Sequence, residues 1–137
     1  MGFILNVEGT TLGIETIKSV EFDVASPNDS NAKTTDVAVT ATITGKILTM
    51  LDDGTEATVE LAKWSMISCE EATCYKNVVI QSTAAGQMVR EYTMPNAFVV
   101  DYTETYDDVE GVGTFKLVVR QKKDKIPTVT VNGGYGV

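Results

Sequence analysis

The chain has 137 residues, of which 43 % are hydrophobic and 22 % are charged, and its formal net charge is −8. This length predicts a single domain over residues 1–137, and the share of apolar residues excludes a chain that stays disordered. The acidic charge argues against a module that binds nucleic-acid phosphates or an anionic lipid surface.

Three strands are predicted in the first third of the chain. Residues 2–7 form an apolar run that Glu8 and Gly9 end. In residues 19–24, Val20 and the two following apolar positions alternate with polar side chains, which is the period of a half-buried strand. Residues 37–44 repeat the alternation with many β-branched side chains, which favour strands.

A long polar segment, residues 26–35, separates these two alternating strands. A hairpin connection needs only about two to five residues. The segment has no apolar residue except Ala32, so it cannot build a core of its own. We therefore predict an extended arm that contacts another molecule.

One helix is predicted, over residues 55–67. Leu51-Asp-Asp-Gly54 is a turn signal, and Thr55 is a suitable N-cap. Two cysteines, Cys69 and Cys74, follow the helix. We expect two reduced thiols, as is usual inside cells, and a local disulfide is the alternative.

The second half of the chain is again rich in strand patterns. Residues 75–81 and 87–93 are predicted to form a hairpin around Ala84-Ala-Gly86. Pro95 then marks an edge, a bulge or a break, because proline cannot donate a ladder hydrogen bond. Two further alternating strands follow, residues 98–103 and 115–120. The pattern as a whole predicts a mainly β fold, an antiparallel β-barrel or sandwich with one short α-helix.

No set of residues indicates catalysis. The chain contains no histidine, and this absence excludes Ser-His-Asp and Cys-His catalysis and removes the commonest metal ligand. The pairs Asp52-Asp53 and Asp107-Asp108 lack the spacing of a calcium loop and are interpreted as solvated turns. We therefore expect a protein that is not an enzyme and that has no cofactor and no metal.

The order of these elements resembles a known family of tube subunits. Ile43-Thr-Gly-Lys-Ile47 ends the return strand, the single helix follows, and Pro95-Asn-Ala-Phe-Val-Val-Asp-Tyr102 and Phe115-Lys-Leu-Val-Val119 supply the last strands. In this order the chain is similar to the hemolysin-coregulated protein of type VI secretion systems and to phage tail-tube proteins. An aromatic and glycine signature that many type VI members carry after their second strand is absent.

The resemblance implies a structural tube subunit of a contractile injection system, which forms stacked hexameric rings with a central channel. The implied partners are further copies of the chain and the sheath, baseplate or spike proteins of a contractile machine, with effectors or DNA as channel contents and no membrane. The sequence shows no signal peptide and no apolar run of about 20 residues that could span a bilayer. We therefore expect assembly in the cytoplasm, followed by secretion or release as a virion-like particle.

Two surfaces follow from this resemblance. The first is a ring-stacking interface on the polar arm: Ser26, Asn28, Asp29, Ser30, Asn31, Lys33 and Thr34. The second is a channel-facing surface on the polar sides of the alternating strands: Glu21, Asp23, Thr40, Thr42, Asp101, Thr103, Lys116 and Arg120. We expect its carboxylates to make an acidic wall, opposite core positions that include Val20, Val100 and Tyr102.

A second function fits the same strand pattern. A secreted or surface β-sandwich that binds protein or carbohydrate has the same polar and apolar faces when it is a monomer in solvent. Such a module exposes an aromatic platform. The aromatic residues here fall mostly on the predicted core side of their strands (Phe22, Phe98, Tyr102 and Phe115), which argues against it.

Overall fold

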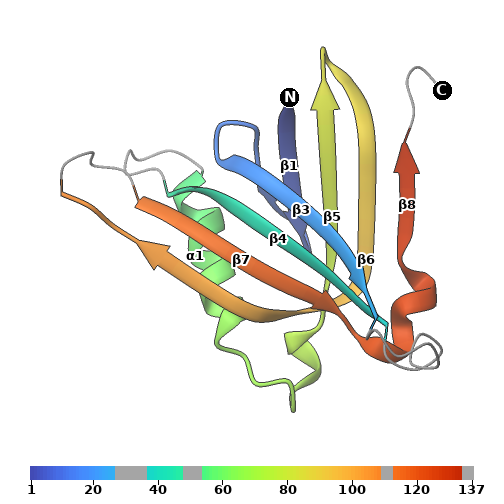
Figure 1. Cartoon of the computed structure of the whole chain (residues 1–137). Coiled ribbons are helices and arrows are strands. Elements are labelled where there is room, and N and C mark those ends of the chain that lie inside the picture. Colours follow the sequence, from blue (N-terminus) through green and yellow to red (C-terminus); the bar gives the residue numbers. More distant parts are fainter. Residues whose placement is uncertain (27–36, 48–53, 109–112, 134–137) are drawn as a thin grey trace.

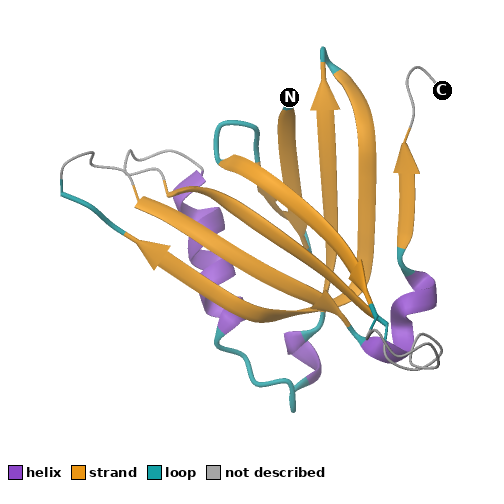
Figure 2. Ribbon diagram, in the orientation of Figure 1, coloured by secondary structure: helices purple, strands orange, loops and turns teal. Residues whose placement is uncertain are grey.

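The computed structural model describes residues 1–26, 37–47, 54–108 and 113–133. Its strands are β1 (Gly2–Val7), β2 (Thr10–Leu12), β3 (Ile17–Ala25), β4 (Ala38–Ile47), β5 (Lys76–Ala84), β6 (Gln87–Thr105), β7 (Gly113–Gln121) and β8 (Thr130–Gly133). Its helices are the α-helix α1 (Gly54–Ser65) and the 3-10 helices η2 (Ala72–Cys74) and η3 (Lys123–Thr128). The predicted mainly antiparallel β fold with one short α-helix is confirmed (Figure 2).

All the strands belong to one sheet, with the order β2-β1-β5-β6-β7-β4-β3, and β8 pairs with β6 beside this path. Every pairing is antiparallel. The sheet does not close on itself: within the described residues, β2 and β3 end the main strand order without pairing with each other, and β8 is a further edge beside β6. Of the two predicted architectures, a barrel or a sandwich, the described strands therefore do not form a closed barrel, because the first and last strands in the sheet order do not pair.

The sheet folds over at the long strand β6, which belongs to both of its halves (Figure 1). Residues 87–97 of β6 pair with β5, and residues 97–105 pair with β7. Opposite Lys76 and Val78, β6 carries one extra residue between Met94 and Ala97, at the position of Pro95. This bulge confirms one of the interpretations of Pro95, and a bulge bends a strand strongly.

Two-residue turns connect the strands of two hairpins, β1–β2 and β5–β6. Glu8 and Gly9 both have positive φ angles, of 47° and 90°, between β1 and β2. Ala85 and Gly86 likewise have φ angles of 53° and 77° between β5 and β6. Two consecutive residues with positive φ form the turn type whose twist matches that of a two-residue hairpin.

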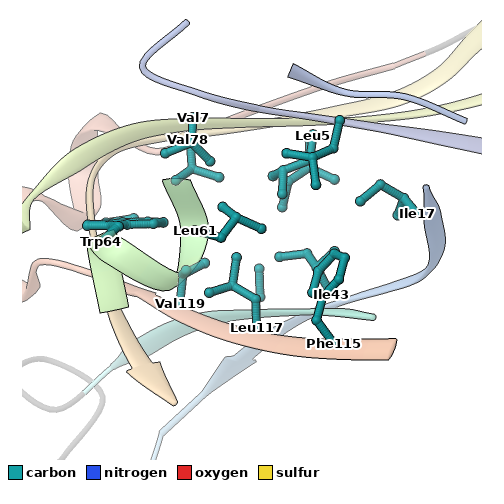
Figure 3. Close-up of a cluster of buried hydrophobic side chains, with 14 of the residues drawn as sticks. Leu5, Val7, Ile17, Ile43, Leu61, Trp64, Val78, Phe115, Leu117 and Val119 are labelled. Atoms are coloured by element: carbon teal, nitrogen blue, oxygen red, sulfur yellow. The ribbon is translucent and has the colours of Figure 1, made fainter. Parts of the chain in front are cut away.

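The core lies between the two halves of the sheet, and α1 closes one side of it (Figure 3). Leu5 and Val78 come from one half, whereas Leu117 and Val119 come from the other. Leu61 of α1 lies between them in Figure 3. This packing explains why the helix forms where the sequence predicts one, although it ends at Ser65 and not at Ile67.

One ring contact and two hydrogen bonds join parts of the fold that are distant in the chain. The rings of Phe22 in β3 and Tyr92 in β6 are stacked with centroids 4.2 Å apart, across the space between the two halves. The indole Nε1 of Trp64 donates a hydrogen bond to the carbonyl oxygen of Cys74 at 2.7 Å. The amide of Lys122 donates to the carbonyl of Asn96 at 2.8 Å, which ties the end of β7 to the bend of β6.

Two elements of the C-terminal part are absent from the sequence prediction. The last seven residues, Val131-Asn-Gly-Gly-Tyr-Gly-Val137, are rich in glycine, which favours a mobile end unless a neighbour holds it. In the structure, residues 130–133 form β8 against Arg90–Thr93 of β6. The basic run Lys122-Lys-Asp-Lys125 lies largely within η3, which the sequence does not predict. The neighbour in the sheet, and not the local sequence, makes the tail a strand.

Candidate functional site

The candidate site is one face of the sheet formed by β3, β4, β7 and the second half of β6, called here the polar face. The predicted channel-facing residues define it: Glu21, Asp23, Thr40, Thr42, Asp101, Thr103, Lys116 and Arg120. Strand register brings all eight to the same face. It is opposite the fully buried residues Ala41, Ile43, Leu117 and Val119.

Neighbouring strands align the polar face in rows. Asp23 pairs with Thr40, and Thr40 pairs with Arg120 in β7. The Arg120 guanidinium Nε donates to the Thr40 hydroxyl at 3.4 Å, so this row also has a side-chain contact. In the next row Glu21 pairs with Thr42. Every second side chain of a strand points to the same side of the sheet. Because neighbouring strands align these side chains, the polar residues form one continuous surface.

The charge of the polar face differs from the expected acidic wall. Lys46 of β4 follows the same parity as Thr40 and Thr42, and it pairs with Thr114. Lys18 lines a shallow depression of about 460 Å³ together with Thr44 and Lys116. The described strands therefore place four cations (Lys18, Lys46, Lys116 and Arg120) beside three carboxylates (Glu21, Asp23 and Asp101). The described face is therefore mixed in charge and not an acidic wall, because Lys18 and Lys46 join Lys116 and Arg120, which the sequence prediction already placed there.

The predicted core parity is also wrong at part of β6. An irregularity between Val99 and Asp101 adds one residue, so that Val99 pairs with Val119 and Asp101 with Val118. Phe98 consequently aligns with Arg120 on the polar side, and Val100 is 44 % exposed. Tyr102 still lies on the core side, opposite Leu117. A bulge shifts the alternation by one residue, and it leaves no clear mark in a sequence of apolar residues.

The expected core position Val24 is exposed as well. It pairs with buried Val39 but is itself 55 % exposed, near the end of the edge strand β3. The alternation in the sequence correctly places the side chain of Val24 on the core side of the sheet. To be buried, the side chain must also be covered by another part of the chain, and the described residues leave Val24 largely uncovered near the end of the edge strand.

A carboxylate and two tyrosines lie at the far end of β6. Glu104 accepts hydrogen bonds from the hydroxyls of Tyr102 at 2.6 Å and Tyr106 at 2.8 Å. Burial is the largest cause that raises the pKa of Tyr102, and its hydrogen bond to Glu104 is the next. The separate hydrogen bond that Tyr106 donates to Glu104 is the largest cause that raises the pKa of Tyr106. Both hydroxyls therefore stay protonated at neutral pH. The group is a structural hydrogen-bond set at the end of the strand.

The predicted ring-stacking residues cannot be placed in the same way. Ser26 is exposed just after β3. Asn28, Asp29, Ser30, Asn31, Lys33 and Thr34 lie outside the described residues. Asp52 and Asp53 do so too, and Asp107 and Asp108 are exposed. In the part of the chain that the structure describes, no group of three or more potential ligands is placed to hold a metal.

The described helices include none that is long and apolar enough to cross a bilayer. No protein-family model matches the sequence, and no curated protein sequence matches it. Similarity to known proteins is therefore a matter of structure.

Solved structures of low sequence identity share this arrangement of strands. Hcp1 from Flavobacterium johnsoniae is 17 % identical and has a TM-score of 0.64, and the match covers 98 % of this chain and 97 % of Hcp1. A chain of the sheath-tube complex of an extracellular contractile injection system, PVC, in the extended state is 13 % identical, with a TM-score of 0.57 and coverage of 97 % and 89 %. A chain of the virion of a native gene transfer agent particle is 5 % identical, with a TM-score of 0.53 and coverage of 97 % and 95 %.

These matches define the class of fold. The chain has the fold of Hcp1 and phage tail-tube proteins over nearly its whole length. The resemblance drawn from the order of elements is confirmed for the fold.

Proposed function

We propose that this chain is a structural tube subunit of a contractile injection system, and that it is not an enzyme. The observation that carries the proposal is the match to Hcp1 and to a sheath-tube complex over almost all of the chain. In this proposal, residues 1–137 act as one domain. Six copies form a ring, and rings stack into a hollow tube whose channel is lined by the polar face.

Two features of the sheet support assembly into a ring. The edge strand β3 has nine residues, and no described strand pairs with its outer side. A long free edge is a site for pairing with another chain, and a closed ring satisfies every such edge at once. The polar face is wide, carries charges of both signs and is backed by a packed core, which suits a rigid wall in contact with water.

The alternative, a β-sandwich that binds protein or carbohydrate, is not favoured. Phe22, Tyr102 and Phe115 lie on the core side and pack within it. On the described strands of the polar side, Phe98 is the one aromatic residue, and its ring makes an edge contact with Tyr75 at 6.0 Å. A binding platform needs several exposed aromatic rings in one plane.

Ring formation is the direct test of the proposed function. Native mass spectrometry of the purified chain is expected to show a hexamer, and negative-stain electron microscopy is expected to show rings with a central hole. A sample that stays monomeric at high concentration and forms no rings would contradict the proposal.

The same proposal includes assembly in the cytoplasm and export or release as a particle. It also includes contact with sheath, baseplate or spike proteins.

A second prediction concerns the arm that follows β3. Ala25 pairs with Ala38, so the hairpin is connected by residues 26–37, well beyond the usual length. We expect deletion of residues 28–33 to preserve the fold and the rings and to abolish their stacking into tubes. Far-UV circular dichroism, native mass spectrometry and electron microscopy measure the three properties.

The control for this deletion replaces residues 28–33 with glycine and serine at the original length. If side chains of the arm contact the next ring, this variant also fails to form tubes. Tube formation by the deletion variant at the rate of the original chain would show that the arm is not a stacking interface.

A further inference from the structure

Two thiols lie together in the segment that joins α1 to β5. The chain makes two successive turns there: the amide of Glu71 donates to the carbonyl of Ser68 at 3.0 Å, and the amide of Cys74 donates to the carbonyl of Glu71 at 3.1 Å. These turns bring Cys69 back toward Cys74. The Cys69 thiol is near enough to be one cause of the raised pKa of Cys74, and both cysteines are free thiols.

The two cysteines differ in access and in how firmly they are held. Cys69 is exposed, whereas Cys74 is only 1 % exposed. The backbone of Cys74 is fixed on both sides, because its carbonyl accepts the bond from Trp64 and the next amide, that of Tyr75, donates to Ala72 at 3.2 Å. A reagent in solution therefore meets Cys69 first, and Cys74 is held close behind it.

This arrangement is unlike a metal site. A structural zinc site has four ligands, usually cysteine and histidine. The chain has no histidine, and the described residues contain no cluster of three or more potential ligands around the thiols. The arrangement is that of an accessible thiol paired with a second thiol that can resolve a mixed disulfide.

We propose that Cys69 and Cys74 form a reversible intramolecular disulfide when the chain meets a low-molecular-weight disulfide oxidant, such as oxidised glutathione. The inference concerns a modification site of the folded chain and does not depend on the tube function. The bond would tie the segment after α1 to the start of β5, at the side of the core that the helix covers.

The reaction consists of two exchanges. The thiolate of Cys69 attacks one sulfur of the oxidant, so that a mixed disulfide forms and the first small thiolate leaves. Cys74 then loses its proton to the leaving thiolate or to water, and its sulfur attacks the Cys69 sulfur, which releases the second small thiol. In total the two cysteines lose two electrons and two protons, and the oxidant becomes two thiols.

The acid-base properties of the pair agree with this order. Burial is the largest cause that raises the pKa of Cys74 to about 11, and the hydrogen bond to Cys69 is the next. Cys74 therefore stays protonated at neutral pH and is a poor first nucleophile, since the thiolate is the reactive form. Its attack follows only when a mixed disulfide is held next to it.

The test uses the purified full chain, reduced and then incubated with oxidised glutathione. After alkylation with N-ethylmaleimide, intact-mass spectrometry is expected to show a chain that has lost two hydrogen atoms and carries neither alkyl groups nor glutathione. Dithiothreitol should restore a chain that takes up two alkyl groups. The readout is the same for a monomer and for a ring, so its failure is distinct from failure of the tube proposal.

Two single variants separate the roles. Cys74→Ala is expected to stop at a stable glutathione adduct on Cys69. The surface variant Cys69→Ser is expected to form no adduct within the time in which the original chain is fully oxidised. A lasting glutathione adduct on the original chain, a disulfide-linked dimer on a non-reducing gel, or two alkylated thiols after oxidation would each overturn the proposal.

Discussion

Replacement of Gly45 by alanine should lower the free energy of unfolding by about 1–3 kcal/mol, although only one methyl group is added. Gly45 is in β4, at the place where the chain before β3 passes over it. A Cβ at this position would lie 2.5 Å from the carbonyl oxygen of Thr16 and 2.6 Å from the ring of Phe115. The neighbouring amide of Lys46 donates to the same carbonyl at 2.7 Å, so the backbone cannot move away without losing this bond.

Gly13→Ala is the matched control for this prediction. A Cβ at Gly13 would meet only the carboxylate of Glu15, at 3.7 Å, which is an ordinary contact. Urea denaturation followed by circular dichroism measures both variants. The midpoint should fall clearly for Gly45→Ala and stay near the original value for Gly13→Ala. Equal midpoints for the two variants would show that the contact with Thr16 and Phe115 relaxes freely.

The second large effect concerns access to the polar face in assembled tubes. We expect a cysteine placed at Asp23 or Asp101 to react with a small maleimide but not with a maleimide attached to a globular protein. The background chain carries Cys69→Ser and Cys74→Ala, so that the introduced thiol is the only one. Both positions are exposed in the single chain, and a channel wall is the arrangement that leaves them open to small molecules alone.

Dissociated and denatured samples provide the controls for the labelling experiment. After dissociation of the tubes, both reagents should react with the exposed positions, and in denaturant they should react to the same extent. Mass spectrometry gives the labelled fraction. Equal labelling of intact tubes by both reagents would place the polar face on the outside and would leave a solvent-facing sheet as the better account.

The charge of this face alters what a channel of this kind would do. With cations and carboxylates mixed, it would not repel an anionic cargo as an acidic wall would. Opposite charges in neighbouring rows also lower the field at a distance, because their contributions cancel. A channel lined in this way would hold neither strongly acidic nor strongly basic cargo by charge alone.

The alternating parts of the sequence predict the fold well. Residues 37–44 and 115–120 alternate in the sequence. From Val39 onward the structure buries one side of each strand, whereas the other side is half-buried along most of β4 and mostly exposed along β7. The helix is predicted to within two residues at its end, and the turn at Ala84-Ala-Gly86 is correct. These features depend on local rules, which is why they can be found in a single sequence.

The remaining features depend on partners that are distant in the chain. β6 is one strand through Pro95 because β5 pairs with its first half and β7 with its second. The extra residue near Val100 changes which side Phe98 occupies, and β8 forms only because β6 offers an edge to it. The close approach of Cys69 to Cys74 depends on two successive turns that their spacing does not reveal. A single sequence therefore does not predict which strands pair, where a bulge shifts their register, or which free edge a further strand joins.

The place of β7 in the sheet has a consequence for how the protein is made. β7 lies between β4 and β6, yet it follows both in the chain. It supplies Phe115, Leu117 and Val119, all buried, and without them β4 has no partner on one side and the core is open. The strands β3 and β4 pair directly with each other, whereas the pairing of β4 with β7 joins segments that are distant in the chain and is expected later in folding. A chain truncated before β7 would lack the three buried side chains Phe115, Leu117 and Val119, so completion of the core requires translation past β7.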